Sequence, residues 1–261
     1  TDYAIIPDSD ILDGMTDYLS ISFWLKVPNS TVSVTTLIGK NRINSDNSDD
    51  AYSIGLSNGQ LRCYLAGSGN NIIAYESEKL LNDDSWHHIA FVWNRPTAQI
   101  YIDGVYDESV TYNPFDYPLN NSIRDLTIGA LETGDDQWGY HFTGQMSDLQ
   151  IWNRALTQTD VQNYMFLRSF SNLDGLAGYW RNNPDYSTFF DQTDNLNDGL
   201  IYGALSTDDV HMQYHDCDGN CIDGNVDLGC GCGETGPIDV DYCDVCGGDG
   251  WSCAPMGDVN Q

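Results

Sequence analysis

The chain has 261 residues, of which 10 are basic and 39 acidic, and its formal net charge is −29 at pH 7. Phosphate groups are bound by lysine and arginine, so this charge argues against nucleic acid or an anionic membrane as a direct partner. No apolar run approaches the roughly eighteen residues of a membrane helix, so no membrane insertion is expected. The acidic residues favour either solubility in salt or oxygen ligands for calcium.

The first segments predict β-strands. Residues 3–6 and 19–25 are rich in apolar and aromatic side chains. In the second segment Leu19, Ile21, Phe23 and Leu25 alternate with other residues, which predicts a sheet packed on one side.

Two dipeptides predict tight hairpins. Asn58-Gly59 lies within the strand-like stretch 52–65, and Asp103-Gly104 follows the stretch 99–102. Both dipeptides readily adopt the positive φ angles of two-residue hairpin turns. Cys63 lies in the first of these hairpins, far in sequence from the other cysteines, which favours a buried thiol over a disulfide partner.

Residues 85–152 contain further strand signals. Residues 85–93, 126–130 and 144–152 predict strands, and residues 132–137 predict a polar, acidic loop. A helix is expected to start after Thr157, because Thr157 suits an N-cap and Asp160 stands at the capping-box position.

The residues give no sign of an enzyme. His87 and His88 are adjacent in a strand and are interpreted as a sheet and a core histidine, because no third metal ligand accompanies them. The acidic triplet Glu-x-Asp-x-Glu, which supplies the catalytic carboxylates of some glycosidases from one strand, is absent. The nearest pair, Glu76 and Glu78, lies where a loop is expected. No phosphate loop, HExxH or Gly-x-Ser-x-Gly motif occurs either.

The series SWHHIAFVW, IYIDG, LTIGA and FTGQMSDLQIWNRALT, preceded by FWLKV and LIGK, resembles laminin-G-like and pentraxin-like domains. These are relatives of the concanavalin A-type lectins, and the resemblance covers residues 1–166. It implies an all-β fold, a two-sheet antiparallel jelly-roll sandwich with one short helix. Members of this family bind calcium, sugars, lipid headgroups or proteins, so the fold alone does not name the ligand.

The resemblance also implies calcium ligands. In pentraxin-like domains an acidic pair before the strand that here starts at Tyr52 and acids in a later loop hold the ion together. The matching residues are Asp49 and Asp50 in the first loop and Glu132, Asp135 and Asp136 in the second. A solvated hairpin tip is the alternative for the first loop.

Two aromatic residues beside the second acidic loop are candidates for contact with a ligand. Trp138 and Tyr140 follow Asp135 and Asp136 closely, and exposed aromatic rings stack on sugar faces. The alternative is that either ring is packed beneath the loop.

The segment 172–208 resembles the lead-in that usually precedes such domains, with GYW, a later Asp, NDG and GA. Here it follows the domain body, so it is expected to complete the same sandwich with terminal strands. The expected domains are a jelly roll over residues 1–210 and an extension over 211–261. Removing the residues after Ser169 is expected to expose a sheet edge and cause aggregation.

The extension is rich in cysteine, aspartate and glycine and has too few apolar residues for a core. Two of its stretches resemble thrombospondin-type calcium repeats, with oxygen side chains at alternate positions. Zinc is the alternative metal, although the cysteine spacings do not form paired CxxC knuckles. The candidate calcium ligands are Asp216, Asp218, Asn220, Asp223, Asn225 and Asp227, and the candidate disulfide cysteines are Cys217, Cys221, Cys230, Cys232, Cys243, Cys246 and Cys253.

These observations predict a non-enzymatic, calcium-dependent binding or adhesion module with a small disulfide-rich, loop-dominated tail. The many cysteines favour an oxidising compartment, so a secreted or cell-surface location is expected. The expected partner is a glycan or another surface ligand. Two alternatives stay open: a structural subunit that associates with itself in a surface layer or filament, and a non-catalytic domain of a larger secreted polysaccharide-degrading enzyme.

Overall fold

The computed structural model describes residues 2–31, 33–42, 50–67, 71–107, 117–134, 137–166, 173–181 and 187–204, with the backbone alone for 71–75. All of these lie in the compact unit Thr1–Val210. The predictions for Asp49, Asp135, Asp136 and the cysteine-rich extension therefore fall outside the described residues. Within the described residues, no helix is long and apolar enough to cross a membrane.

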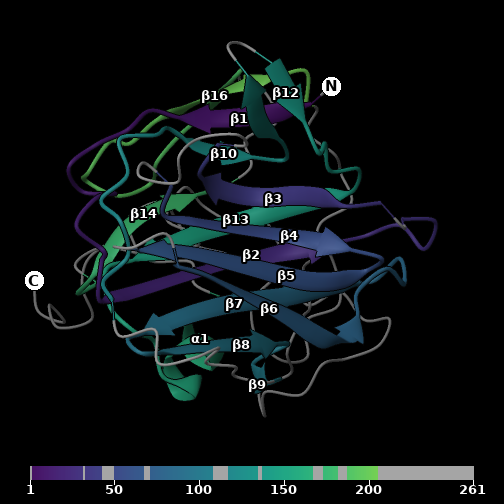
Figure 1. Ribbon diagram of the computed structural model, residues 1–261, viewed down its shortest axis with the longest axis horizontal. Coiled ribbons are helices and arrows are strands. Elements are labelled where there is room, and N and C mark those ends of the chain that lie inside the picture. The colour runs from purple at the N-terminus through teal and green to yellow at the C-terminus, as the bar shows by residue number, and fades with distance from the viewer. Residues whose placement is uncertain are drawn as a thin grey trace, which may run out of the picture. The chain divides into compact units, whose positions relative to one another are not determined.

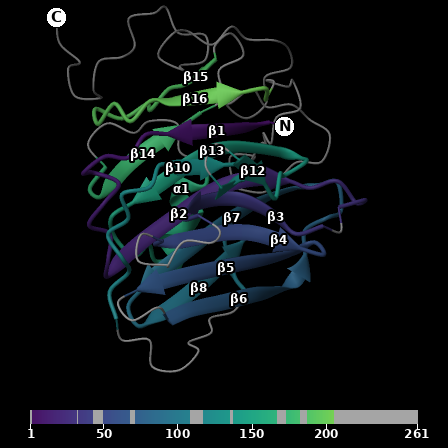
Figure 2. The same ribbon diagram turned by 45° about the horizontal axis from the view of Figure 1, so that its top comes forward.

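Two main antiparallel sheets form the sandwich that the sequence predicts (Figures 1 and 2). The eight-stranded sheet has the order β15-β16-β1-β10-β3-β4-β5-β6, the six-stranded sheet has the order β14-β13-β2-β7-β8-β9, and β11 and β12 form a separate ribbon. The strands and the helix are β1 (Tyr3–Ile6), β2 (Tyr18–Lys26), β3 (Thr35–Lys40), β4 (Tyr52–Ser57), β5 (Gln60–Gly67), β6 (Asn71–Leu80), β7 (Trp86–Asn94), β8 (Thr97–Ile102), β9 (Val105–Tyr106), β10 (Leu126–Ile128), β11 (Leu131–Gly134), β12 (Gln137–Gly139), β13 (Gln145–Trp152), α1 (Gln158–Tyr164), β14 (Leu176–Trp180), β15 (Thr188–Phe189) and β16 (Gly199–Tyr202).

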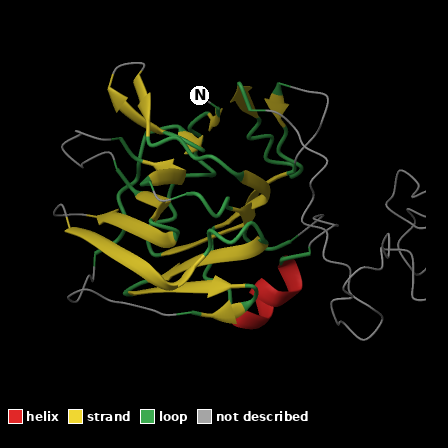
Figure 3. Cartoon of the chain, turned by 90° about the vertical axis from the view of Figure 1, so that its right-hand side faces the viewer, coloured by secondary structure: helices red, strands yellow, loops and turns green. Residues whose placement is uncertain are grey.

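The main core lies between the two sheets and contains the alternating apolar residues of β2. The prediction that this sheet is packed on one side only is wrong, because Ser20, Ser22 and Trp24 on the opposite face of β2 are also buried. A second apolar cluster joins that face to the helix, with Trp152 and Tyr179 from the sheet packed near Val161 of α1. Figure 3 shows α1 against the strands.

The local signals for turns and for the helix are confirmed. Asn58-Gly59 joins β4 to β5, and Asp103-Gly104 joins β8 to β9, with positive φ at all four residues. Thr157 caps α1 and forms the expected capping box with Asp160. Cys63 is buried and free.

Two segments expected to be loops are strands. Glu76 and Glu78 lie in β6, where Ser77 between them is buried and bonds to the neighbouring strand through the amide of Leu61. A strand at the edge of a sheet with one solvated face tolerates charges at alternate positions. Such a strand has no continuous apolar run, so its sequence does not predict a strand. Glu132 likewise lies in β11 rather than in a loop.

The segment after the helix contributes strands to both sheets. β14 pairs with β13 at the end of the six-stranded sheet, whereas β16 pairs with β1 in the eight-stranded sheet. The buried carboxylate of Asp191 organises the connection, since it accepts hydrogen bonds from the backbone amides of Tyr179, Thr193 and Asn197. These pairings place β14 and β16 in the same sandwich as β1 and β13.

Candidate aromatic binding site

Three aromatic rings from distant parts of the sequence form a stack near one end of the eight-stranded sheet. On β1, Ala4 and Ile6 are buried in the sandwich, so the alternation of a strand directs Tyr3 away from it. Tyr202 on β16 is the direct cross-strand partner of Tyr3 and lies on the same outer face. Trp138 comes from the ribbon strand β12, which Figure 1 shows beside β1 and β16.

The rings of this stack are nearly parallel. The Tyr3 centroid lies 4.4 Å from the Trp138 centroid, with an interplanar angle of 20°. It lies 4.9 Å from the Tyr202 centroid, with an angle of 17°. Tyr202 is 41% exposed, while Tyr3 and Trp138 are partly buried. We call Tyr3, Trp138 and Tyr202 the aromatic stack; it offers ring surface to solvent on a rigid sheet.

A cluster of charges lies next to the stack. Glu132 is directly opposite Trp138 in the ribbon, so both side chains project from the same face of it. The carboxylate of Glu132 lies 3.4 Å from Arg42 Nε and 4.0 Å from Arg124 Nη1. All three side chains are between one fifth and one third exposed, so they can offer hydrogen-bond donors and acceptors beside the rings.

The second predicted platform residue, Tyr140, is 44% exposed. Its backbone has a positive φ of 53°, and its carbonyl accepts a 2.7 Å hydrogen bond from the amide of Thr36. This bond ties the chain after the ribbon to β3. Of the two predicted platform residues, Trp138 therefore belongs to the aromatic stack. Tyr140 lies outside it, where the chain leaves the ribbon and bonds to β3.

The predicted calcium ligands that the structure describes already have protein partners. Asp50 is buried and its Oδ1 accepts a 2.9 Å hydrogen bond from the amide of Arg42. Glu132 faces two arginines, with which a calcium ion would have to compete. Across the described ranges, no group of three or more histidine, cysteine, aspartate or glutamate residues is placed to hold a metal. Calcium at Asp49, Asp135 and Asp136 stays a prediction.

His87 and His88 occupy different environments. His88 is buried beside Trp24, with ring centroids 5.4 Å apart. His87 lies between two carboxylates, 2.9 Å from Asp103 Oδ2 and 3.2 Å from Asp83 Oδ2. Its hydrogen bond to Asp103 raises the pKa of His87 and outweighs burial, which lowers it.

This cluster also links the two sheets. Lys79 of β6, in the eight-stranded sheet, forms a 3.0 Å ion pair with Asp103, which lies in the turn after β8 of the six-stranded sheet. Burial acts to raise the pKa of Asp103, but hydrogen bonds from His87 and Lys79 prevail and lower it. The ion pairs of Asp103 with Lys79 and His87 therefore stabilise the packing of the two sheets.

Sequence reasoning identified Trp138 but missed four residues around it. The strand alternation around Tyr3 and Tyr202 could have predicted that both rings lie on the outer face of the sheet, because their neighbours in β1 and β16 face the sandwich. What the sequence does not reveal is that β1 pairs with β16, nearly two hundred positions later. Arg42 and Arg124 belong to loops whose approach to Glu132 depends on the same tertiary arrangement.

Comparison with solved structures agrees with this fold. A carbohydrate-binding protein candidate from Bacteroides ovatus matches with a TM-score of 0.61 at 18% identity, covering 80% of this chain and 59% of that one. The chain thus spans about 59% of the length of that protein. The heptameric SAP-like pentraxin of Limulus polyphemus matches with a TM-score of 0.46 at 16% identity, covering 69% of this chain and 92% of that chain.

At 18% identity, the likeness to the B. ovatus protein establishes the fold alone. A search of curated proteins finds no match to the sequence. The family model of the concanavalin A-like lectin/glucanases superfamily matches residues 1–162, which is more than half of the chain. The chain therefore belongs to the concanavalin A-like lectin/glucanases superfamily, through a domain of the laminin-G type.

Proposed function

We propose that this protein is a secreted, non-catalytic module that binds glycans through the aromatic stack. The observation that carries the proposal is the parallel stacking of Tyr3 on Trp138 and Tyr202, with Tyr202 exposed at the outer face of a sheet. Aromatic rings present flat apolar surfaces that match the C–H faces of pyranose rings. The neighbouring Arg42–Glu132–Arg124 cluster supplies donors and acceptors for sugar hydroxyls.

The charge of the protein narrows the class of glycan. A formal charge of −29 repels polysulfated and polyuronic chains over distances of about a Debye length, roughly 8 Å at physiological salt. The two arginines beside the stack are already paired with Glu132. A neutral or cationic glycan therefore fits better than an anionic one. The B. ovatus protein with the similar fold is described as a carbohydrate-binding protein candidate, which is compatible with this choice.

Calcium dependence is part of the proposal and rests on residues outside the described ranges. Asp49, Asp135 and Asp136 flank or interrupt the elements that carry Asp50, Glu132 and Trp138. An ion held there would order the ribbon that positions Trp138. The cysteine-rich extension is proposed to be cross-linked by disulfides and to hold calcium as well.

A glycan array probed with the full-length chain tests the proposal. Binding to neutral or cationic glycans, reduced in a parallel array with a calcium chelator, is the expected result. Binding confined to sulfated or uronic glycans would contradict the charge argument, and binding to no glycan at all would reject the glycan-binding function.

Self-association is a second candidate, favoured by the placement of the terminal strands. β14 lies at the end of the six-stranded sheet and β15 at the end of the eight-stranded sheet. Strand edges recruit further strands by backbone hydrogen bonding. Light scattering over a range of protein concentrations tests this candidate: growth of the mass with concentration supports it, and a constant monomer mass rejects it.

A further inference from the structure

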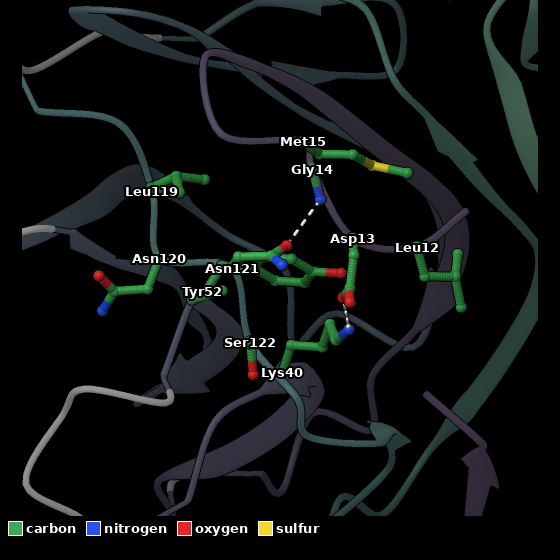
Figure 4. Close-up of a pocket in the computed structure, with 11 residues that line it drawn as sticks. Leu12, Asp13, Gly14, Met15, Lys40, Tyr52, Leu119, Asn120, Asn121 and Ser122 are labelled. Carbon is green, nitrogen blue, oxygen red and sulfur yellow. Dashed lines mark hydrogen bonds and ion pairs between the residues drawn. The ribbon is translucent and has the colours of Figure 1, made fainter. Parts of the chain in front are cut away.

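A small pocket is lined by eleven residues, none of which belongs to the aromatic stack (Figure 4). Lys40 at the end of β3 and Tyr52 at the start of β4 are direct cross-strand partners and line it from one side. The loops around Asp13 and Asn121 line it from the other sides. Its empty volume is about 230 Å³ including the opening to solvent, and the space open to a water-sized group is about that of one water molecule.

A buried ion-pair cluster fixes one wall of the pocket. The side chain of Lys40 is 1% exposed, and its Nζ lies 2.5 Å from Asp8 Oδ1 and 2.6 Å from Asp13 Oδ1. A buried ammonium group requires such partners, so the two carboxylates are held in place. The second oxygen of the Asp13 carboxylate remains as an acceptor at the pocket, where Figure 4 shows Asp13 beside the Tyr52 ring.

The hydroxyl of Tyr52 is the unusual group here. Tyr52 is 4% exposed, and its Oη has no hydrogen-bond partner among the described residues. Burial, followed by the charge of Asp13, raises the pKa of Tyr52, so the hydroxyl keeps its proton. Leaving a buried hydroxyl unpaired is costly, so this group favours a hydrogen-bonding partner in the pocket.

A third polar group converges on the same space. Asn121 Oδ1 accepts a 2.8 Å hydrogen bond from the amide of Gly14, which fixes the orientation of the side-chain amide. Its Nδ2 is therefore a donor, while Tyr52 Oη can both donate and accept. Around these groups the walls are apolar, formed by Leu12, Met15 and Leu119.

From this geometry we infer that the pocket is a binding subsite for a single hydroxyl group of a sugar or other neutral polyol. A hydroxyl both donates and accepts, so it satisfies Asp13, Tyr52 and Asn121 together. A carboxylate would meet Asp13 with like charge, and an ammonium, which donates but does not accept hydrogen bonds, would leave the Asn121 Nδ2 donor unpaired. The sugar ring itself would stay outside, because the pocket holds about one water-sized group and Leu12 and Met15 are buried. The inference does not depend on the aromatic stack, because the two sites share no residue.

Amide NMR of the full-length chain, titrated with neutral methyl pyranosides and with glycerol, tests this inference. Because Gly14 donates to Asn121 at the pocket wall, its amide resonance reports occupation. At least one of these probes is expected to shift it in a saturable way. Tyr52→Phe should raise the dissociation constant about fivefold or more through loss of one hydrogen bond. Asn121→Ala is a second variant with the same expectation, followed at the amide of Met15 because Gly14 then lacks its acceptor.

Tyr64→Phe is the matched control, since Tyr64 lies on β5 and accepts a hydrogen bond from Arg62 outside the pocket. It should bind the probe like the wild type, and so should Tyr202→Ala, which alters only the aromatic stack. An unshifted Gly14 amide with every probe, or wild-type affinity in Tyr52→Phe, would overturn the inference. So would a crystal soaked with the probe in which a fixed water molecule keeps the place beside Tyr52 Oη.

Discussion

His87 is held between Asp83 and Asp103, so its contribution to stability depends on pH. Its pKa is raised by the hydrogen bond to Asp103 above the ordinary value of 6.5. Below pH 6.5 the histidine is protonated in both the folded and the unfolded chain, and the stabilisation is fully present. As the pH rises through the raised pKa of the folded state, His87 loses its proton and the stabilisation is lost.

His87→Gln is therefore expected to lower the free energy of unfolding more at pH 5.5 than at pH 8, by about 0.2–1 kcal/mol, because the Asp103 side chain is 40% exposed and solvent screens the pair. Urea denaturation at the two pH values measures this difference. The control is Asp103→Asn, made once in the wild type and once in the His87→Gln variant. Without His87, the loss of unfolding free energy caused by Asp103→Asn should be the same at pH 5.5 and at pH 8. Equal losses for His87→Gln at both pH values would contradict the electrostatic role.

Cys63 is the one cysteine that the structure describes, and it is 2% exposed. Burial raises the pKa of its thiol, and the thiolate is the form that reacts with alkylating agents. We expect the peptide that contains Cys63 to stay unlabelled by iodoacetamide at pH 8 in the folded chain and to be labelled fully in urea. Mass spectrometry of the digested protein checks this, and rapid labelling of the folded chain would contradict the burial.

At the scale of elements, the terminal strands close the sandwich. Truncation after Ser169 removes β14 and β16 and so leaves β13 and β1 each without one neighbour. It also removes Trp180, which is fully buried in the main core. We expect this variant to aggregate at concentrations where a chain truncated after residue 204 stays monodisperse in size-exclusion chromatography. A monodisperse, folded product after Ser169 would show that the terminal strands are dispensable.

The elements also show what the sequence can and cannot predict. Hairpin turns at Asn58 and Asp103 and the cap at Thr157 were predictable because each depends on local backbone geometry. The aromatic stack was not, because it requires the pairing of β1 with β16 and the position of a separate ribbon. The edge strand β6 was missed for a different reason: its charges at alternate positions resemble those of a loop.

The pocket illustrates the same limit at a finer level. Asp13 lies in no motif, and Lys40 closes the LIGK segment, which points to the fold and not to a pocket. Only the register of β3 against β4 puts Lys40 beside Tyr52, and only tertiary packing brings Asn121 to Gly14. Sites of this kind depend on the register between strands. A slip of one residue would turn each side chain to the other face of the sheet and so destroy the site.

At the scale of the whole molecule, the formal charge of −29 has two explanations, solubility and calcium binding. Adding or removing calcium distinguishes them and so tests the proposed calcium dependence. Ion binding to the folded state alone stabilises it, by about 2.7 kcal/mol when the ion is at 100 times its dissociation constant. For a domain of this size that corresponds to a melting temperature higher by roughly 5–10 °C. A thermal melt with calcium and with a chelator, together with metal quantification, is expected to show this difference.

Point variants then locate the ion. Asp49→Asn and Asp135→Asn should each abolish the calcium-dependent part of the shift if the jelly-roll loops hold it. A chain truncated after residue 204 separates these loops from the extension. Identical melts with calcium and chelator, and no recovered calcium, would mean that the acidic residues serve solubility alone.

The aromatic stack is the central claim, and calorimetric titration of the best neutral glycan from the array tests it most directly. Tyr202→Ala removes the exposed ring, and stacking contributes about 0.5–1.5 kcal/mol beyond the area it buries. Tyr106→Ala is the matched control, because Tyr106 is exposed to a similar extent, 39% against 41%, but lies on β9 of the other sheet. We predict that Tyr202→Ala weakens binding by about two- to tenfold while Tyr106→Ala binds like the wild type. Equal affinities for all three proteins would contradict the account.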